Sequence, residues 1–362
     1  MPLVAYGPPY RLAANEDKSF IGSYVLGMGF VLTPEEAQAL IAKDLRNKDV
    51  LFPYLNGEDL NSRPDQSPSR WVINFHNWPL ERAETYPDCM AIVREKVKPE
   101  RDKLASGDAT AKDRARRWWQ FARPTMNLYA TIAGMRRVLV LCIVTHHVGF
   151  AFVPTNQVFA HRLVVFPIEG WSQFALLQSN LHEPWARTYS SQLETRLNYS
   201  PTDCFETYPF PESTASLEEI GEWYYHERQG IMQRRQEGLT KTYNRFHDPH
   251  ERAEDIAALR ELHAEMDRAV ALAYGWGDLD LGHGFHQTKQ GTRYTISEAA
   301  RQEALARLLA LNHQRYAEEE TLGLHDKRGK GKKGSRRTEA SAPGKGQAEA
   351  TARAPGLFDE EA

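Results

Sequence analysis

A short run near the N-terminus, YGPPY at residues 6–10, has residues suited to chemistry on an amino group of a nucleobase. In enzymes that methylate such an amine, an Asn, Asp or Ser followed by Pro-Pro-aromatic binds the amine and stacks the flipped base on its ring. Gly7 stands at the polar position here and has no side chain to accept a proton. A methyl-donor site also needs a strand, a glycine-rich turn and a helix upstream, and only six residues precede Gly7. We expect no intact methyl-transfer site.

Other clusters lack the spacing of known catalytic or metal sites. Residues 16–18 (Glu-Asp-Lys) have the Glu-x-Lys spacing of a nuclease but no upstream acidic partner. His146 and His147 are adjacent in an apolar run, and on a strand their side chains would point to opposite faces and could not share a metal. The remaining histidines do not form an HExxH pattern, and "GDLDLGHGF" (277–285) favours a loop. We expect no catalytic, cofactor-binding or metal-binding residue.

Composition limits the possible partners and compartments. The net charge of -3 gives no overall basic signature, so any nucleic-acid binding must come from local patches. Cys89, Cys142 and Cys204 are far apart and form no CxxC pair, which favours neither a disulfide framework nor a zinc site. No apolar run approaches the roughly 18 residues of a membrane span, and no signal-peptide pattern is present. We expect a cytoplasmic protein.

The expected secondary structure changes along the chain from strands with inserted helices to helices alone. This order predicts an α+β fold. Thr33, Pro34 and Glu36 form a capping pattern that predicts a short helix ending near 46–47. Residues 95–124 favour a helix, a bend at 106–107 and a second helix. Strands are predicted from β-branched and aromatic runs at residues 70–75, 136–147, 149–154 and 161–168.

After Trp171 the apolar period changes to that of helices. Pro184, Ser216 with Glu219, and Ser297 are predicted helix starts, and a further helix covers the apolar positions from Ile256 to Val270. The expected ranges are a junction segment with a short helix (1–47), a β-rich domain (48–211), a helical spacer or docking domain (212–324) and a disordered basic tail (325–362).

A dense polar turn at residues 56–61 interrupts the apolar run before the first predicted strand. Two carboxylates there argue against a phosphate cradle, and the ligand spacing does not fit Ca²⁺. We interpret it as a hydrogen-bonded junction in which Asx side chains satisfy turn amides, Gly57 takes a positive φ, and the carboxylates pair with Arg63 or Arg70. Direct base reading by this turn is the alternative.

Six sequence blocks follow one another between about residues 11 and 211: PYLNGEDLN, SRWVINFHNWPLERAETYPD, VKPERDKL, RRWWQFARP, LLQSNLHEPWARTYSS and TRLNYSPTDCFETYPFP. In this order they resemble the target-recognition region of MmeI-like type II (IIG/IIL) restriction-modification enzymes, which are N6-adenine DNA methyltransferases. The segments 237–249 and 259–276 look like the helical region that follows it in many of those proteins.

The resemblance implies a sequence-specific DNA recognition module acting in phage defence. Such enzymes carry their methyltransferase domain upstream, so we expect this chain to be a truncated or split protein that binds double-stranded DNA. It would work with a methyltransferase, and possibly a nuclease, domain or subunit, and S-adenosylmethionine would bind that partner. A complete DNA-modifying enzyme with an unrecognised site and a non-DNA protein-interaction module remain alternatives.

Candidate DNA-binding residues are polar or cationic side chains that suit base edges or phosphates. Arginines around Trp118 and Trp119 could form a phosphate clamp. An equally good interpretation is that the two tryptophans lie in the core and the arginines beside them are solvated. Residues 189–200 favour a helix that approaches the backbone, with plain surface as the alternative. Asn156 and Gln157 suit an adenine edge or a polar turn. The full set is Arg70, Arg114, Arg116, Arg117, Arg123, Arg136, Asn156, Gln157, Arg187, Ser190, Ser191 and Arg196.

Overall fold

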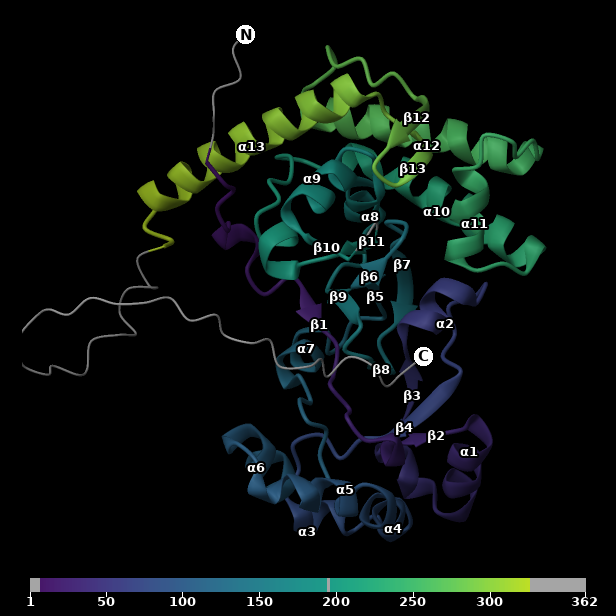
Figure 1. The fold of residues 1–362 in the computed structure, drawn as a ribbon, viewed down its shortest axis with the longest axis vertical. Helices are drawn as coiled ribbons and strands as arrows, with labels where there is room; N and C mark the ends of the chain where they lie inside the picture. The colour runs from purple at the N-terminus through teal and green to yellow at the C-terminus, as the bar shows by residue number, and fades with distance from the viewer. Residues whose placement is uncertain (1–6, 194–195, 326–362) are drawn as a thin grey trace, which may run out of the picture. The chain divides into compact units, whose positions relative to one another are not determined.

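Two four-stranded sheets form the β-rich part of the chain in the computed structural model, which describes residues 7–193 and 196–325 (Figure 1). Their strand orders are β1-β9-β5-β7 and β2-β4-β3-β8. Among the strand pairs of the described residues, β3 with β8 is the parallel one. The strands of these sheets are β1 (Phe20–Ile21), β2 (Val31–Leu32), β3 (Leu51–Leu55), β4 (Arg70–Ile73), β5 (Arg137–Cys142), β7 (Ala151–Pro154), β8 (Val158–Phe159) and β9 (Leu163–Phe166). Each of the four predicted strand runs contains a strand, whereas β1, β2, β3 and β8 were not predicted.

Helices of the first half follow local start signals. Thr33 caps α1 with a complete capping box, as predicted, because its side chain accepts from Glu36 N while Glu36 accepts from Thr33 N. The helix ends at Lys43, and a 3₁₀ turn continues from Leu45 to Asp49. The helices here are α1 (Pro34–Lys43), α2 (Gly57–Ser62), α3 (Leu80–Ala83), α4 (Pro87–Lys96), α5 (Lys98–Asp102), α6 (Ala109–Arg116), α7 (Met126–Thr131), α8 (Trp171–Gln178) and α9 (His182–Tyr189).

The later part of the chain is mainly helical, so the predicted α+β class is confirmed. Its helices are α10 (Glu218–Arg235), α11 (Leu239–Phe246), α12 (Glu254–Ala273) and α13 (Glu298–Thr321). Ser297 caps α13 as predicted, whereas Ser216 lies in a 3₁₀ turn and does not cap α10. Between α12 and α13 the chain forms a β-hairpin, β12 (Gly284–Thr288) and β13 (Gly291–Thr295), that the sequence analysis did not predict.

Two hydrophobic cores stabilise the fold. The smaller core packs α1 and α4 against the β2-β4-β3-β8 sheet. The larger core joins β5, β7 and β9 to α8, α10 and α12. The β5 strand, RVLVLC, is buried from its second residue onward because other elements cover both of its faces. The core thereby fixes the chain on either side of residues 143–148, which carry the polar site described below.

The polar turn at residues 56–61 is a helix start. Asn56 caps α2, because its side-chain oxygen accepts the N–H of Asp59 at 2.8 Å, so the predicted Asx hydrogen bond is confirmed. Gly57 has no positive φ and is the first residue of the helix, so that part of the interpretation was wrong. Asp59 pairs with neither Arg63 nor Arg70, since it is buried and its carboxylate accepts the N–H of Ser69 at 3.0 Å.

Replacing Asn56 with Ala removes this cap. We expect the free energy of unfolding to fall by about 1 kcal/mol, the usual cost of losing an N-cap side chain. Chemical denaturation measures the loss. Asn56→Asp keeps an acceptor at the same place and should retain most of the stability, so equal losses in both variants would contradict the capping role.

The described residues up to Leu324 belong to one compact unit. The predicted boundaries at 47, 211 and 324 stay predictions, and the predicted tail lies outside the described residues except for His325. Within the described ranges no helix combines the length and apolar character needed to span a bilayer.

Candidate nucleic-acid interface

A small three-stranded sheet brings four of the predicted DNA-binding residues together. β6 (Val144–Thr145) pairs with β11 (Arg196–Asn198), which pairs with β10 (Ser191–Leu193). The expected helix over residues 189–200 was wrong, because the chain turns back as a hairpin against β6 and α9 ends at Tyr189. Strand pairing therefore brings Ser191 and Arg196 together, and Arg187 and Ser190 lie beside them at the end of α9.

Two of these four side chains are exposed and two hold the structure in place. Ser191 and Arg196 are exposed. Ser190 is buried, and its hydroxyl accepts the N–H of Ser200 at 3.1 Å. Arg187 pairs with Glu183 at 2.7 Å and donates to the carbonyl of His146 at 3.2 Å. Ser191 and Arg196 are thus better placed to meet a ligand than Ser190 and Arg187.

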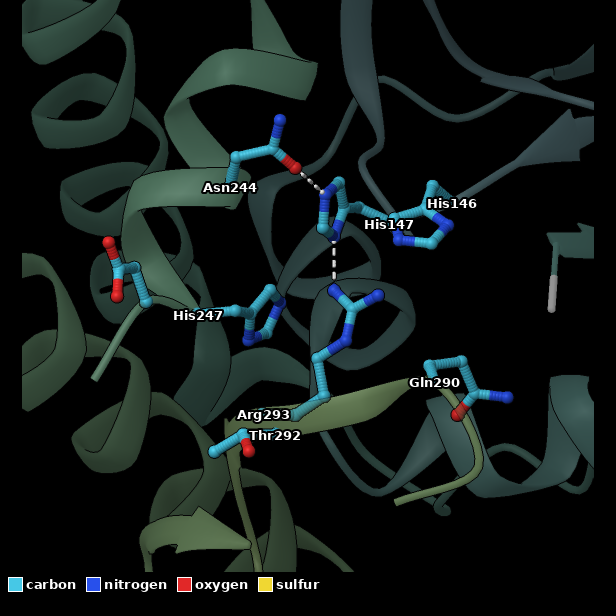
Figure 2. Close-up of a pocket in the computed structure, with 8 residues that line it drawn as sticks. His146, His147, Asn244, His247, Gln290, Thr292 and Arg293 are labelled. Atoms are coloured by element: carbon cyan, nitrogen blue, oxygen red, sulfur yellow. Dashed lines mark hydrogen bonds between the residues drawn. The ribbon is translucent and has the colours of Figure 1, made fainter. Parts of the chain in front are cut away.

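A polar pocket adjoins this sheet. Its volume is about 200 Å³, and Figure 2 shows its wall built from the chain after β6, from α11 and from the β12–β13 hairpin. The rings of His146 and His147 both contribute, with centroids 5.0 Å apart. The expected placement of these two histidines on opposite strand faces was wrong, because β6 ends at Thr145. The lining residues are His146, His147, Asn244, His247, Asp248, Gln290, Thr292 and Arg293.

Hydrogen bonds fix the protonation of His147. Arg293 can only donate, and its Nη1 lies 2.6 Å from Nδ1 of His147, so that nitrogen is the acceptor. The Nε2 of the ring therefore carries the proton and donates to Oδ1 of Asn244 at 2.8 Å. Burial, reinforced by the guanidinium of Arg293, lowers the pKa of His147 to about 3. The imidazole is a neutral link between hairpin and α11.

The other pocket histidines are also held neutral. Burial lowers the pKa of His247 well below its ordinary value, with His147 and Arg293 adding to the effect. Burial also lowers the pKa of His146, and the nearby guanidinium groups of Arg293, Arg187 and Arg196 lower it further. The pocket adjoins the β10-β11-β6 sheet because His146 directly follows β6.

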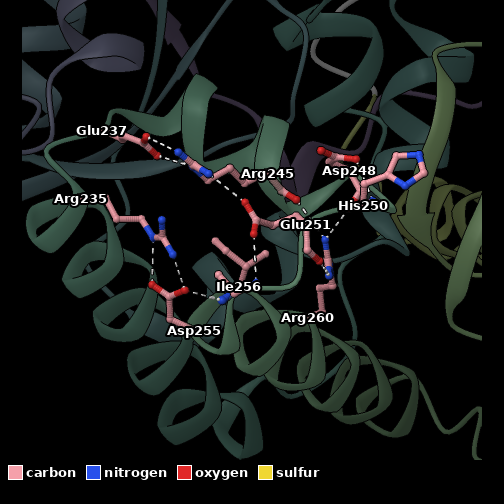
Figure 3. Close-up of polar contacts among 10 residues, drawn as sticks. Arg235, Glu237, Arg245, Asp248, His250, Glu251, Asp255, Ile256 and Arg260 are labelled. Carbon is pink, nitrogen blue, oxygen red and sulfur yellow. Dashed lines mark hydrogen bonds and ion pairs between the residues drawn. The ribbon is translucent and has the colours of Figure 1, made fainter.

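Ion pairs and a buried guanidinium hold the α11 wall of this pocket (Figure 3). Arg245 bridges Glu237 and Glu251, at 2.8 Å each. Arg260 of α12 donates to the carbonyls of Arg245, Phe246, Asp248 and Glu251 around the end of α11. A cation at a helix C-terminus satisfies carbonyls that have no partner within the helix. Asn244 and His247 are thereby held facing His147.

The buried carboxylate of Asp267 fixes the hairpin relative to the first half. It accepts from both the backbone and the side-chain nitrogen of Asn180, at 2.8 Å each, and from Nε2 of His283 at 2.8 Å. Asn180 in turn accepts from the hydroxyl of Thr295 in β13 at 3.0 Å. The start and the end of the hairpin are therefore tied to the turn between α8 and α9.

The predicted arginine clamp around the tandem tryptophans lies at the end of the fold that holds α3 to α6, away from the hairpin (Figure 1). Trp118 is buried in the smaller core, and Nε1 of Trp119 donates to the carbonyl of Trp78 at 2.8 Å, so the core interpretation holds for both rings. Arg116 and Arg117 both pair with Asp113. Arg114 also lies on α6, partly buried.

The remaining candidates lie apart from the pocket. Arg123 is exposed beside the ring of Tyr24, and Arg70 opens β4. Arg136 and Asn156 are exposed at the opposite end of β5 from His146. Gln157 is only 5 % exposed and donates to the carbonyl of Pro154 at 2.8 Å, which favours the polar-turn alternative over reading of an adenine edge. A DNA role for the exposed members stays a prediction.

The sequence analysis missed the pocket residues of the hairpin and of α11. The hairpin residues Gln290, Thr292 and Arg293 follow the run 277–285, which the sequence analysis assigned to a loop. Asn244 lies inside a helix, where no binding motif marks it. The alternation in GFHQTKQGTRYT around a glycine-containing turn was a usable hairpin signal. Across residues 7–193 and 196–325 no group of three or more His, Cys, Asp or Glu side chains has metal-binding geometry.

Comparison with known proteins places the chain in a family. No curated protein matches it. A solved structure with a similar fold is the type IIL restriction-modification enzyme MmeI in complex with DNA, at a TM-score of 0.61 and 17% identity. The match covers 87% of this chain and 37% of MmeI, so this chain spans well under half of that protein. The family model of the MmeI target recognition domain matches residues 17–212. Because this match spans more than half of the sequence, the chain belongs to the MmeI target recognition domain family.

Proposed function

We propose that this protein recognises a specific sequence in double-stranded DNA as the target-recognition module of a restriction-modification system. The family match over residues 17–212 carries the proposal. The likeness to a protein solved in complex with DNA supports it. We place the main reading surface at the edge of the β10-β11-β6 sheet, where Ser191 and Arg196 are exposed.

The chemistry of this edge suits DNA. Arg is the residue that most often reads guanine, through two parallel hydrogen bonds to O6 and N7, and serine hydroxyls reach phosphates and bases. The cationic side chains near His146 come from α9, from the β10-β11-β6 sheet and from the hairpin, so they form a local patch in a protein whose net charge is -3. Such a patch supplies the attraction to phosphates that the whole chain lacks.

The wider setting is also part of this proposal. Adenine N6 methylation would be performed by a methyltransferase domain or subunit, which would bind S-adenosylmethionine, and the system would act against phage DNA in the cytoplasm. In that setting this module determines which sequence is modified. A protein-interaction role without DNA binding is the competing function, and the binding test below distinguishes the two.

Selection of bound duplexes from a randomised library tests the reading surface. The wild-type chain is expected to enrich one defined sequence. Arg196→Ala should relax the preference at one base pair, at a cost of about 1 to 3 kcal/mol for that pair, if Arg196 reads a base edge. If it contacts a phosphate instead, affinity should fall equally for all sequences. Asn156→Ala and Arg123→Ala test the other exposed candidates in the same way.

Arg46→Ala is the matched control, since Arg46 is exposed, pairs with Asp44 and is not a candidate. It removes the same charge and should leave the enriched sequence unchanged. Absence of any binding to duplex DNA at low salt by the folded wild-type chain would refute the proposed function.

A further inference from the structure

We propose that the pocket between β6, α11 and the β12–β13 hairpin holds a phosphodiester group of the DNA backbone, with the guanidinium of Arg293 as its main donor. The inference rests on the DNA-recognition function proposed above. It adds to the interface a hairpin that lies outside residues 17–212, the range matched by the family model.

Arg293 carries a buried charge with few partners. The residue is 8 % exposed, forms no ion pair within the described part of the chain, and makes one hydrogen bond there, from Nη1 to His147. Glu183, the nearby acid that acts on its pKa, is engaged by Arg187. Burial lowers the pKa of Arg293, because the charged guanidinium is less stable away from water. A bound anion would offset that cost and use the remaining N–H groups of the fork.

The pocket has the size and the surroundings for a phosphate. Its volume of about 200 Å³ is several times the roughly 30 Å³ that one water molecule occupies in the liquid. Gln290 supplies an amide beside Arg293, and Figure 2 shows it on the hairpin. The hydroxyl of Thr292 already donates to Oε1 of Gln287 at 3.0 Å. The amide N–H groups of Gln290 can bind phosphate oxygens without adding further buried charge.

The position of the pocket favours DNA as the source of the phosphate. Its rim residue His146 directly follows β6, which pairs with β11, and the carbonyl of His146 accepts from Arg187 at 3.2 Å, so the pocket continues the sheet edge proposed to read the target. A duplex lying along that edge presents a row of phosphates. Asp248 is the one carboxylate of the wall. It is exposed to solvent, and its Oδ1 accepts the N–H of His250 at 2.8 Å.

Arg293→Gln tests the charge directly, because glutamine can still donate to His147. Binding of the full chain to a pool of random duplexes is measured over a series of salt concentrations. The variant should bind all sequences roughly tenfold more weakly at low salt, as expected for one lost charge-assisted contact. The slope of log affinity against log salt should become shallower by about 0.9, the value for one phosphate. An unchanged slope in a folded variant would overturn the proposal.

Gln290→Glu tests the same site without removing a buried side chain. It places a negative charge of the same shape at the rim and should weaken binding to all duplexes, while Asp248→Asn should strengthen it. Gln233→Glu, on an exposed position of α10 outside the pocket, is the matched control and should bind as the wild type does. Equal affinities for the Gln290→Glu and Gln233→Glu variants would refute the inference even if Arg293→Gln failed to fold.

Two further outcomes separate this inference from the function on which it rests. Wild-type binding with a changed base preference, but an unchanged salt slope, in Arg293→Gln would mean that the hairpin reads a base and that the phosphate assignment is wrong. Inorganic phosphate that raises the melting temperature of the wild type but not of Arg293→Gln, with equal DNA affinity of the two proteins, would assign the pocket to a free anion. A wild type that binds no DNA would remove both proposals.

Discussion

Lowering the pH from about 7.5 to about 5 is expected to reduce the free energy of unfolding by about 4 kcal/mol, through His147 and His182. Both side chains are buried, and burial lowers the pKa of His147 to about 3 and that of His182 to about 4. In the unfolded chain each imidazole takes up a proton near its ordinary pKa of about 6.5. The unfolded state therefore binds more protons between these limits, and stability is lost as the pH falls below about 6.5.

Denaturant unfolding at a series of pH values measures this dependence. His182→Gln removes one of the two groups, so its stability should fall about 2 kcal/mol less over the same range, even if it is lower at neutral pH. Phe174→Leu, a core change without a titrating group, should lower stability equally at every pH. A wild-type stability that is flat from about pH 7 to about pH 5 would show that these histidines are not buried as neutral groups.

Truncating Arg228 to Ala is expected to cost about 3 to 5 kcal/mol of stability, because it opens a large cavity and leaves buried acceptors without a donor. Arg228 lies on α10 and is 0 % exposed. It donates to the carbonyl of Phe150 at 2.6 Å, to Oε1 of Gln178 at 3.1 Å and to the hydroxyl of Tyr243 at 3.0 Å. These partners precede β7 or lie in α8 and α11, so one side chain joins the β-rich half to the helices.

No carboxylate pairs with Arg228 within the described residues, and its guanidinium lies against the rings of Phe174 and Tyr225. Arg228→Met fills most of the volume but offers no donor, so its stability should lie between those of the wild type and the Ala variant. Arg234→Ala on the exposed face of the same helix is the control and should change stability by less than about 0.5 kcal/mol. Equal stability of Arg228→Ala and Arg234→Ala would contradict the role assigned to Arg228.

Much of the secondary structure could be predicted because its signals are local. The capping box of Thr33 and the cap of Ser297 involve residues three positions apart, so the sequence alone carries them. β3 was not predicted, and its run LFPYL contains Pro53, a residue that is unfavourable inside a strand. In the structure Pro53 precedes the two-residue pairing of β3 with β8, which begins at Tyr54, so the missing N–H disrupts no bond to β8.

Burial separates the candidate DNA-binding residues that a ligand can reach from those that it cannot. Ser191 and Arg196 are exposed as expected of ligand-binding residues, although they lie on a hairpin and not on a helix. Gln157 and Ser190 have suitable side chains, but both are buried and hydrogen-bonded to the backbone. Residue type shows what a side chain can bind, whereas accessibility depends on the packing of distant segments.

The sequence by itself determined the α+β class, the longer helices, the central strands and the family resemblance, because helix caps, apolar periodicity and ordered sequence blocks are properties of neighbouring residues. Only the tertiary structure showed which residues come together to form the polar pocket. His147 and Arg293 meet although 146 positions separate them, and their meeting depends on Asp267 holding the hairpin against Asn180. A buried hydrogen bond between such distant residues forms only when the intervening elements pack in one arrangement, and no local pattern records that arrangement.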